Sequence, residues 1–371
     1  MKIVIAPDSF KESLSARAAC DWIAKGLRKA APSARLIKIP LADGGEGTLE
    51  ALTAGGRGFS AATTDPLGRK ITARWGMLPD RRTAVVEMAQ ASGLALVPPP
   101  KRNPMLTSSR GTGIQIAQAL DHGAALVILT LGGVATSDGG TGMARALGYR
   151  FLDKSDREIP EGAGGLKFLA RIDSSLIHPR LKKTAFLAAC DVKNTLCGPH
   201  GSARVYGPQK GATPRMVKEI ERNFLNLIKI ARRDLKINIL KIVGGGAAGG
   251  AGAGAAAFLG AKLRPGVQIV FQALDFENRA KSADLIVSGE GKVDAQTLNG
   301  KTVWGVARMA SKHKIPLVVF CGQTGAGHEK LHKLGVTQVI ALRTPGMSVG
   351  HAMKNAGPLL MKKVSETPIL I

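Results

Sequence analysis

The sequence predicts an α/β protein built from two layered domains whose sheets are mostly parallel. Short apolar runs end in polar, glycine-rich turns and are followed by amphipathic stretches, an alternation typical of parallel sheets covered by helices. The chain has 371 residues, which exceeds the size that one hydrophobic core normally serves. Its 46 glycines and its low aromatic content of 4% suit tight strand-to-helix turns and close helix–sheet packing.

The two ends of the chain show the clearest alternation of strands and helices. Their predicted elements are strands at 3–6 and 36–40, helices at 15–29 and just after 48, strands at 283–287, 316–321 and 336–342, and a helix at 303–312. We expect these two ends, residues 1–62 and 280–371, to form one Rossmann-like domain together.

The middle of the chain predicts a second sheet of a different kind. Its predicted elements are paired strands at 71–77 and 83–88, a helix at 115–121, strands at 125–130 and 186–189, a helix at 216–233 and a glycine- and alanine-rich segment at 244–257. We therefore expect a flavodoxin-like α/β domain inserted at residues 63–279.

The formal net charge of +25 raises the possibility of a nucleic-acid-binding protein. The basic residues are spread along the chain, however, with no long basic tail and no basic stripe interleaved with aromatic residues. The pattern favours a basic surface or anionic substrates, with no specific nucleic-acid partner.

The four cysteines have no zinc-ligand spacing, and the histidines do not pair at metal-ligand spacing.

Neither the start of the chain nor its longest uncharged run predicts a membrane segment. Met1 and Lys2 lead directly into a strand, which is unlike a signal peptide. The run from Val243 to Ala261 is dominated by glycine and alanine and is too poor in large apolar residues to span a bilayer. We expect a cytoplasmic protein without a membrane partner.

The most informative segment is the glycine-rich loop from Leu131 to Met143. An apolar run leads into it and a helix-like run follows, so it lies where a strand turns into a helix. Backbone N–H groups in such a loop can point at a phosphate, assisted by the helix N-terminus. We predict that this loop binds an anion. Its candidate ligand-binding residues are Gly132, Gly133, Thr136, Ser137, Asp138, Gly139 and Gly140.

Similar polar loops follow other predicted strands, at the sheet edge where α/β proteins bind ligands. Asp8, Ser9 and Lys11 follow the first strand and suit an anionic, hydroxylated substrate. Each of these loops could instead be a turn or a helix cap. Other loop residues could contact a ligand through an acidic or basic side chain, or are glycines that let a ligand come close to the backbone. They are Asp43, Gly44, Gly45, Glu46, Arg69, Asp191, Lys210, Gly289, Glu290 and Asp294.

Gly300-Lys301-Thr302 ends like a phosphate-binding P-loop, but Ala295 stands where the first glycine of that motif is needed. The P-loop interpretation is therefore rejected. No GxSxG nucleophile motif occurs, and a dinucleotide-binding glycine pattern after a strand is only weakly supported.

In their order along the chain these segments resemble the type I glycerate kinases. The matching segments are 6–11 with 13–16, 42–48, 65–69, 132–142, 189–194 with 196–198, 206–213, 247–250, 263–266 and 288–294. The resemblance implies ATP-dependent phosphorylation of D-glycerate with Mg²⁺, with 2-phosphoglycerate as the expected product. It also implies a two-domain α/β protein.

The resemblance suggests a role for each candidate residue, because phosphoryl transfer needs positioning, charge neutralisation and an oriented hydroxyl. Lys11 or Arg69 would bind the glycerate carboxylate, together with Ser9, Asp43, Gly44 and Gly45. Asp191, or alternatively Asp8, would accept the hydroxyl proton, and Lys210 would balance phosphate charge. The nucleotide phosphates would lie against the glycine-rich loop and Gly289. Glu46, Glu290 and Asp294 would bind Mg²⁺.

Two alternatives stay open at this point. The chain could be a kinase of another small hydroxy acid, or a non-catalytic protein that binds anionic metabolites or nucleic acid. The sequence alone does not decide the 2- or 3-phosphoglycerate product, which acid is the base, or the oligomeric state.

Overall fold

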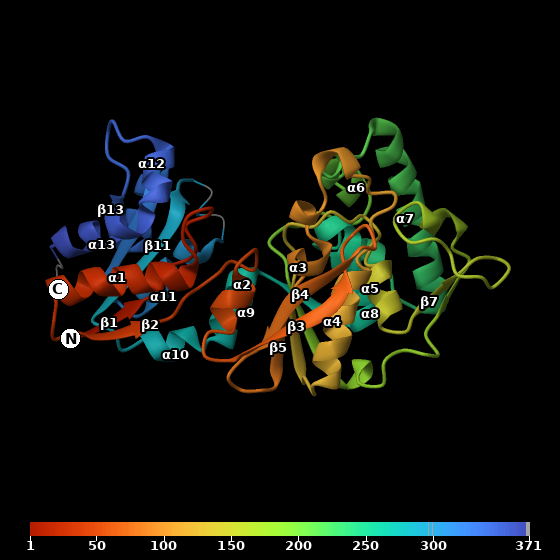
Figure 1. Cartoon of the computed structure of the whole chain (residues 1–371), viewed down its shortest axis with the longest axis horizontal. Coiled ribbons are helices and arrows are strands. Elements are labelled where there is room, and N and C mark those ends of the chain that lie inside the picture. The colour runs from red at the N-terminus through yellow and green to blue at the C-terminus, as the bar shows by residue number, and fades with distance from the viewer. Residues whose placement is uncertain (296, 299, 369–371) are drawn as a thin grey trace. The chain divides into compact units, whose positions relative to one another are not determined.

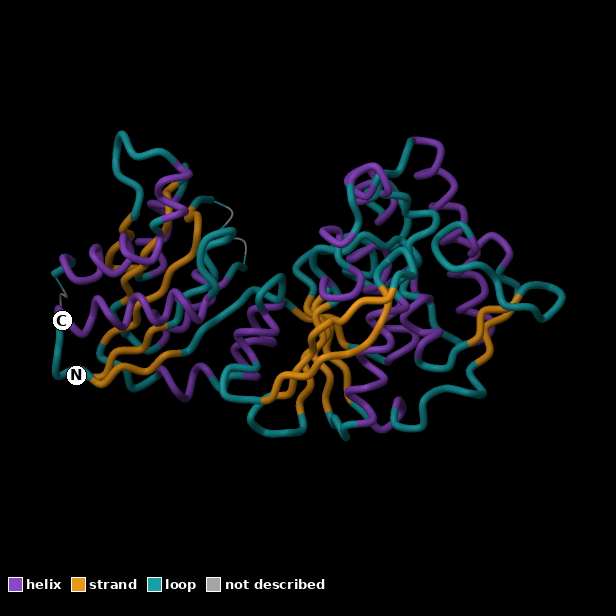
Figure 2. The backbone as a smooth tube through the Cα atoms, viewed as in Figure 1, coloured by secondary structure: helices purple, strands orange, loops and turns teal. Residues whose placement is uncertain are grey.

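The computed structural model describes residues 1–295, 297–298 and 300–368, and the chain divides into two compact units (Figure 1). The first unit comprises Met1–Asp43, Glu50–Ala54 and Val267–Ile371, and the second comprises Gly44–Leu49 and Gly55–Gly266. In both units helices pack around strands (Figure 2), which confirms the predicted α/β class. The domain borders predicted at 62/63 and 279/280 stay a prediction, because compactness does not show that either unit folds independently.

The first unit is built on a five-stranded, wholly parallel sheet with the strand order β13-β12-β11-β1-β2. The strands are β1 (Lys2–Ile5), β2 (Arg35–Lys38), β11 (Leu285–Val293), β12 (Leu317–Thr324) and β13 (Val336–Ala341). The chain adds β2 on one side of β1, whereas β11 lies on the other side and β12 and β13 follow outward. The order therefore reverses between β1 and β11, and such a switch point is where open α/β sheets bind ligands.

Strand β11 is longer than the sequence predicted. We expected the strand to end at 287 and a loop to follow, but pairing with β12 continues to Val293, which lies opposite Thr324. The glycines in this stretch permit the extension because they leave room for the neighbouring backbone. A Cβ atom on Gly289 would lie 2.4 Å from the carbonyl oxygen of Phe320.

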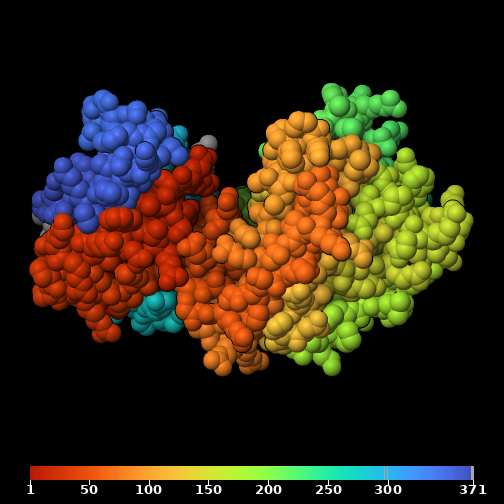
Figure 3. All heavy atoms as spheres, viewed as in Figure 1, coloured from red at the N-terminus to blue at the C-terminus, as the bar shows by residue number. Residues whose placement is uncertain are grey.

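Helices of the first unit bury their apolar faces against this sheet and against one another. They are α1 (Ala16–Ala30), α2 (Thr48–Leu52), α9 (Gly266–Ala273), α10 (Phe276–Ala280), α11 (Thr302–Lys312), α12 (Val349–Lys354) and α13 (Ala356–Glu366), of which α2 and α9 include residues at the border of the second unit. Ser15 caps α1, since its hydroxyl accepts the N–H of Ala18. Helices α1 and α13 pack closely at Gly26 and Val364, so the two ends of the chain lie side by side (red and blue in Figure 3).

The second unit is built on a six-stranded mixed sheet with the order β10-β9-β6-β5-β4-β3. The strands are β3 (Arg57–Thr64), β4 (Lys70–Met77), β5 (Thr83–Glu87), β6 (Leu126–Thr130), β9 (Ala185–Ala189) and β10 (Lys262–Arg264). Strands β3, β4 and β5 are antiparallel, and β5, β6, β9 and β10 are parallel. The sequence predicted β4, β5, β6 and β9 but missed the edge strand β3, whose alternation of small and polar residues is weak.

Helices cover the sheet of the second unit. They are α3 (Ala89–Ser92), α4 (Arg110–Asp121), α5 (Thr141–Ala146), α6 (Ser202–Tyr206), α7 (Pro214–Asp234) and α8 (Ala251–Leu259). Short 3-10 helices occur in the two units at Leu94–Leu96, Pro99–Lys101, Gly165–Phe168, Leu181–Lys183, Pro208–Lys210, Ile239–Lys241, Ala247–Gly250 and His328–Leu334. Within the described part of the chain, no helix is both long enough and apolar enough to cross a membrane.

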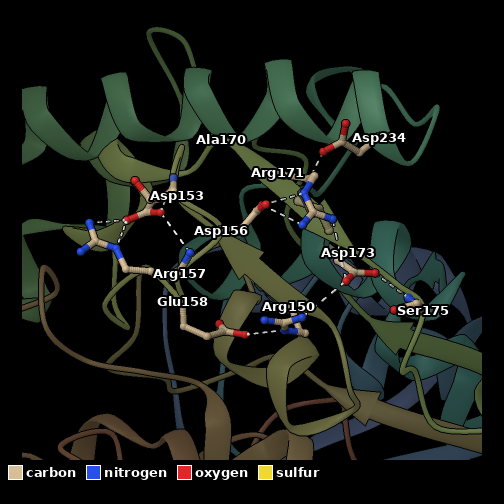
Figure 4. A network of polar contacts seen from close by, with 12 residues as sticks. Arg150, Asp153, Asp156, Arg157, Glu158, Ala170, Arg171, Asp173, Ser175 and Asp234 are labelled. Carbon is tan, nitrogen blue, oxygen red and sulfur yellow. Dashed lines mark hydrogen bonds and ion pairs between the residues drawn. The ribbon is translucent and has the colours of Figure 1, made fainter.

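A two-stranded ribbon of β7 (Arg150–Leu152) and β8 (Arg171–Asp173) carries a network of ion pairs (Figure 4). Arg171 lies 2.7 Å from Asp156, and Arg150 contacts both Glu158 and Asp173. These arginines are paired with carboxylates on their own surface. This part of the chain therefore does not form the unbalanced basic patch that a nucleic-acid-binding surface would need.

The glycine- and alanine-rich segment brings its backbone into contact with the loop after β6. Gly249 has a φ of +68°, and a Cβ atom there would lie 1.9 Å from the carbonyl oxygen of Thr136. A Cβ atom on Gly254 in α8 would lie 2.4 Å from the carbonyl oxygen of Gly139. The small side chains thus allow a close backbone contact that fixes the position of this loop.

We predict that Gly249→Ala destabilises the second unit much more than Gly55→Ala. Both glycines have positive φ values, +68° and +82°, but a Cβ on Gly55 would meet nothing within 4 Å. Gly55→Ala should cost about 1–2 kcal/mol for the left-handed backbone alone, and Gly249→Ala should cost at least ~2 kcal/mol more because of the added clash. Urea unfolding followed by circular dichroism measures both; equal losses would contradict the close contact.

Candidate active site

A cavity of about 290 Å³ opens in the first unit at the carboxyl ends of its parallel strands. Its wall combines acids, cations and an apolar surface from α12. The lining residues are Asp8, Ser9, Phe10, Lys11, Glu12, Ser13, Asp43, Glu290, Gly291, Lys292, Lys301, Gly322, Gln323, Leu342, Arg343, Val349, Ala352, Met353 and Ala356. The structure therefore brings together five of the predicted site residues: Asp8, Ser9, Lys11, Asp43 and Glu290.

Asp8 lies just after β1 and is held by hydrogen bonds to both carboxylate oxygens. The N–H of Ser9 donates to Oδ1 at 2.6 Å, and the hydroxyl of Thr302 at the start of α11 donates to Oδ2. Burial, with the negative charge of Asp43 adding to it, raises the pKa of Asp8 to about 6. The carboxylate is fixed in orientation and titrates close to neutral pH, as a general base requires.

Glu290 projects from β11 into the same cavity. Its Oε1 accepts a hydrogen bond of 2.7 Å from the hydroxyl of Thr297. Burial raises its pKa to about 7, and the charges of Asp8 and Asp43 add to that effect while Lys301 opposes it. Carboxylates that raise one another's pKa in a cavity are typical of functional sites, because the fold alone gains nothing from their repulsion.

The cavity also gathers cations that the sequence reasoning missed. Lys292 in β11 lies 2.8 Å from Asp294, and Lys301 immediately precedes α11. Arg343, just after β13, donates to the carbonyl oxygen of Met347 at 2.8 Å and to Gln323 at 3.4 Å. Lys301 and Lys292 stand in motifs that the sequence reasoning considered, 300–302 and 288–294, but they were not chosen as site residues, and nothing local in the sequence marks Arg343.

Three of the predicted nucleotide and metal residues are not among those that line the cavity. Gly289 is buried in β11, where it lies opposite Phe320 of β12. Asp294 pairs with Lys292. Glu46 is exposed and belongs to the second unit, whereas Glu290 and Asp294 belong to the first.

The glycine-rich loop of the second unit is organised by a buried carboxylate. Asp138 is 0% exposed and accepts hydrogen bonds from the N–H and hydroxyl of Ser109, at 2.8 and 2.7 Å. It also accepts the N–H groups of Gly140 and Gly142, at 3.0 and 3.1 Å. Burial raises the pKa of this carboxyl. Asp138 therefore ties the loop and the start of α5 to the segment that precedes α4.

This arrangement gives two N–H groups of the loop acceptors within the protein, and the predicted phosphate-binding role of the loop stays a prediction. The N–H of Gly139 donates to the carbonyl oxygen of Gly249 at 3.1 Å, and that of Gly140 donates to Asp138. Thr136 and Ser137 are buried, as is the loop from 134 to 141. Among the predicted residues of this loop, Gly132 and Gly133 are the exposed ones.

Lys210 lies inside the second unit rather than at a surface that a ligand could reach. Its side chain is buried, with the residue 2% exposed, and its ammonium donates to the carbonyl oxygen of Thr136 at 2.6 Å. Burial lowers its pKa to about 7, and the charge of Asp138 acts in the opposite direction. Lys210 therefore positions the loop, and its expected direct contact with transferring phosphate has no support in this geometry.

Asp191 and Arg69 are also partly engaged within the second unit. Asp191 is exposed after β9, and its Oδ1 accepts the N–H of Gly266 at 3.0 Å. Arg69 pairs with Asp65 across its own turn and donates to the carbonyl oxygen of Leu96 at 2.9 Å. Arg69 thus stabilises the turn that carries it, whereas Lys11 lines the cavity of the first unit.

Gly44 and Gly45 form a tight turn that begins the second unit. Gly44 has a φ of +90°, and a Cβ atom on it would lie 2.7 Å from the Cα of Gly266. This close approach explains the need for glycine without a ligand. Among the residues that the structure describes, no group of three or more histidine, cysteine or acidic side chains is arranged to hold a metal ion.

Comparison with known proteins decides the family. Residues 3–369 match the sequence profile of the glycerate kinase family. The chain belongs to the glycerate kinase family. A glycerate kinase of Halalkalibacterium halodurans is 46% identical over 96% of this chain and 95% of its own length. The glycerate 2-kinase of Escherichia coli K12 is 44% identical over 96% of this chain and 94% of its own length.

The fold agrees with this membership. A crystal structure of a protein assigned as glycerate kinase 2 from Salmonella typhimurium LT2 superposes with a TM-score of 0.90 at 42% identity, covering 98% of this chain and 96% of that one. The predicted resemblance, the α/β fold class and the prediction of a kinase are confirmed. The roles of individual residues in this glycerate kinase family member stay predictions.

We predict that the buried Lys210 makes the stability of this glycerate kinase family member depend on pH. Its pKa is about 7 in the folded state against 10.5 in the unfolded state, so the unfolded chain binds more protons between those values. The free energy of unfolding of the wild type, relative to Lys210→Met, should therefore rise with pH above 7, by at most ~1.4 kcal/mol per pH unit.

Urea unfolding at pH 6, 7, 8 and 9 measures this difference, with Lys218→Met on the surface of α7 as the matched control. Other titrating groups cancel because they are shared by wild type and variant. A difference that stays constant from pH 6 to 9 would contradict a depressed lysine pKa.

Proposed function

We propose that this enzyme transfers the γ-phosphoryl group of ATP to the 2-hydroxyl of D-glycerate, giving 2-phosphoglycerate and ADP. Membership of the glycerate kinase family and the 44% identity to a glycerate 2-kinase support the reaction. The observation that carries the placement is the cavity of the first unit, where carboxylates and cations meet at the switch point of a parallel sheet. The cytoplasmic location stays an expectation from the sequence.

Asp8 is the proposed general base. Its carboxylate lines the cavity, has a pKa of about 6 and is held by two hydrogen bonds. Asp191, which the sequence favoured, is the second candidate, because it is exposed after β9 and already accepts the N–H of Gly266. A base with a pKa near the working pH combines ionisation with useful proton affinity.

In the proposed transfer step, one proton moves to the protein and one bond to the γ-phosphorus forms while another breaks. The glycerate hydroxyl gives its proton to the Asp8 carboxylate while its oxygen bonds to the γ-phosphorus. The bond from that phosphorus to the oxygen bridging the β- and γ-phosphates breaks, and ADP leaves with the electron pair. Lys11, on the same wall as Asp8 and Ser9, would bind the glycerate carboxylate in preference to Arg69.

The cavity residues fit a bound Mg²⁺. Asp43 and Glu290 line the same cavity and each adds negative charge to its neighbours, so a divalent cation would relieve their repulsion. Magnesium commonly takes one or two carboxylates and completes its shell with substrate phosphates and water, which does not require three protein acids. Asp43 and Glu290 would hold the ion, and its charge would offset the negative charge of the transferring phosphoryl group.

We predict that purified protein, D-glycerate, ATP and Mg²⁺ produce a new phosphomonoester resonance of 2-phosphoglycerate in ³¹P NMR. A resonance of 3-phosphoglycerate would keep the kinase and reject the proposed regiochemistry. A protein that binds ATP but phosphorylates another small hydroxy acid instead would reject D-glycerate as the substrate. Boiled protein and L-glycerate serve as controls.

We predict that Asp8→Asn lowers kcat by at least ~10²-fold, because an amide accepts no proton in the transition state. In the wild type, kcat/KM should fall as pH drops below about 6, where Asp8 becomes protonated. Initial rates from pH 5 to 8 measure both effects. Asp191→Asn is the matched comparison: if it abolishes turnover while Asp8→Asn stays near wild type, Asp191 is the base and the proposal for Asp8 fails.

A further inference from the structure

The polarity and charge of the residues that line the cavity change along the strand order of the first sheet. Beside β13 the cavity wall presents an apolar surface formed by Leu342 and the α12 residues Val349 and Met353, with the guanidinium of Arg343 at its border. In the last residues of β12 and β11 it is polar and cationic, with Gln323 and Lys292, which lie opposite each other in the register. From β11 to β2 it carries acids, which are Glu290 in β11, Asp8 after β1 and Asp43 after β2, with Lys11 also after β1.

The length of this gradient exceeds what glycerate needs. Three strand spacings separate β13 from β1, which is ~14 Å at the usual 4.7–4.9 Å between neighbouring strands. A three-carbon acid covers about one such spacing. The cavity therefore has room for a ligand that reaches from the acidic end to the apolar end.

The apolar end is also chemically wrong for glycerate. Glycerate carries a carboxylate and two hydroxyls, and burying such groups against Leu342, Val349 and Met353 would cost hydrogen bonds to water without replacing them. A flat aromatic base gains from the same surface, and the thioether of Met353 can contact an aromatic ring favourably. Helix α12 leaves this wall accessible, because Ala352 and Met353 are only half-buried and Val349 is 48% exposed.

The glycine-rich loop of the second unit is a weaker candidate for the whole nucleotide. Its residues from 134 to 141 are buried, and its central N–H groups already have acceptors within the protein. Only Gly132 and Gly133 are exposed in this stretch. Two glycines can contact a phosphate, but they provide no surface for a base.

We propose that the apolar end of the cavity, formed by Leu342, Val349, Ala352 and Met353, binds the base of the nucleoside triphosphate that donates the phosphoryl group. The triphosphate then runs past Gln323, Arg343 and Lys292 towards Glu290 and Asp8. This assignment rests on the proposed kinase function and moves the nucleotide from the glycine-rich loop, where the sequence placed it, to the first unit.

The test compares ADP with inorganic tripolyphosphate, which has the phosphates but no base. Isothermal titration of the full-length protein with each ligand gives the wild-type affinities. Ala352→Phe places a large side chain in the apolar end, where overpacking should weaken ADP binding at least ~10-fold and leave tripolyphosphate binding within about twofold. His351→Phe places the same aromatic side chain on the same helix outside the cavity and should change neither affinity.

A second variant keeps the proposal falsifiable if Ala352→Phe disturbs the whole cavity. Met353→Ala removes apolar contact without adding bulk and should weaken ADP about 3- to 10-fold, again without affecting tripolyphosphate. Lys292→Gln, by contrast, should weaken both ligands by similar factors. Unchanged ADP binding in both α12 variants, or equal losses of both ligands in Met353→Ala, would overturn the assignment.

The outcome is separable from that of the proposed function because binding is measured without turnover. If the variants show the expected ADP pattern but the protein phosphorylates no glycerate, the proposed nucleotide site is supported and D-glycerate as the substrate is contradicted. If the wild type makes 2-phosphoglycerate but Ala352→Phe and Met353→Ala bind ADP normally, the proposed function is supported and the proposed base-binding site is contradicted.

Discussion

The strand order of the first sheet is the constraint on which the candidate active site depends. Asp8 and Glu290 come from near opposite ends of the chain and meet because β1 pairs with β11. Parallel strands end at the same edge, so the polar residues that follow them collect there. The same order also separates the acidic end from the apolar wall beside β13. A cavity with chemically distinct ends thus follows from topology, before any loop detail is considered.

The two units use buried ionisable groups in opposite ways. In the second unit, Asp138 accepts four hydrogen bonds and Lys210 supports the carbonyl of Thr136, so both serve the shape of a loop. In the first unit, Asp8 and Glu290 line a cavity, and burial raises the pKa of both, with the charge of Asp43 adding to the effect on each. The sequence marked all four residues as candidate site residues. The structure separates them, because Asp8 and Glu290 line a cavity whereas Asp138 and Lys210 are buried.

The sequence predicted most of the polar loops, but it did not predict which of their residues are buried. Asp8, Lys11 and Glu290 were found because they follow predicted strands, Glu290 between two glycines, and all of them line the cavity. Asp138 stands in an equally suggestive loop and is fully buried. Arg343 was missed because its loop has no glycine-rich signature before it, and its position depends on the pairing of β12 with β13.

By itself the sequence determined the family, the α/β class and the candidate residues, because strand–turn–helix periodicity and short motifs are local properties of the chain. The tertiary structure alone decided which candidates share one cavity, which are sealed inside, and where an apolar wall meets them. The physical reason is that burial and strand pairing join residues distant in the chain. Solvent access and pKa follow from those neighbours, and no local pattern contains them.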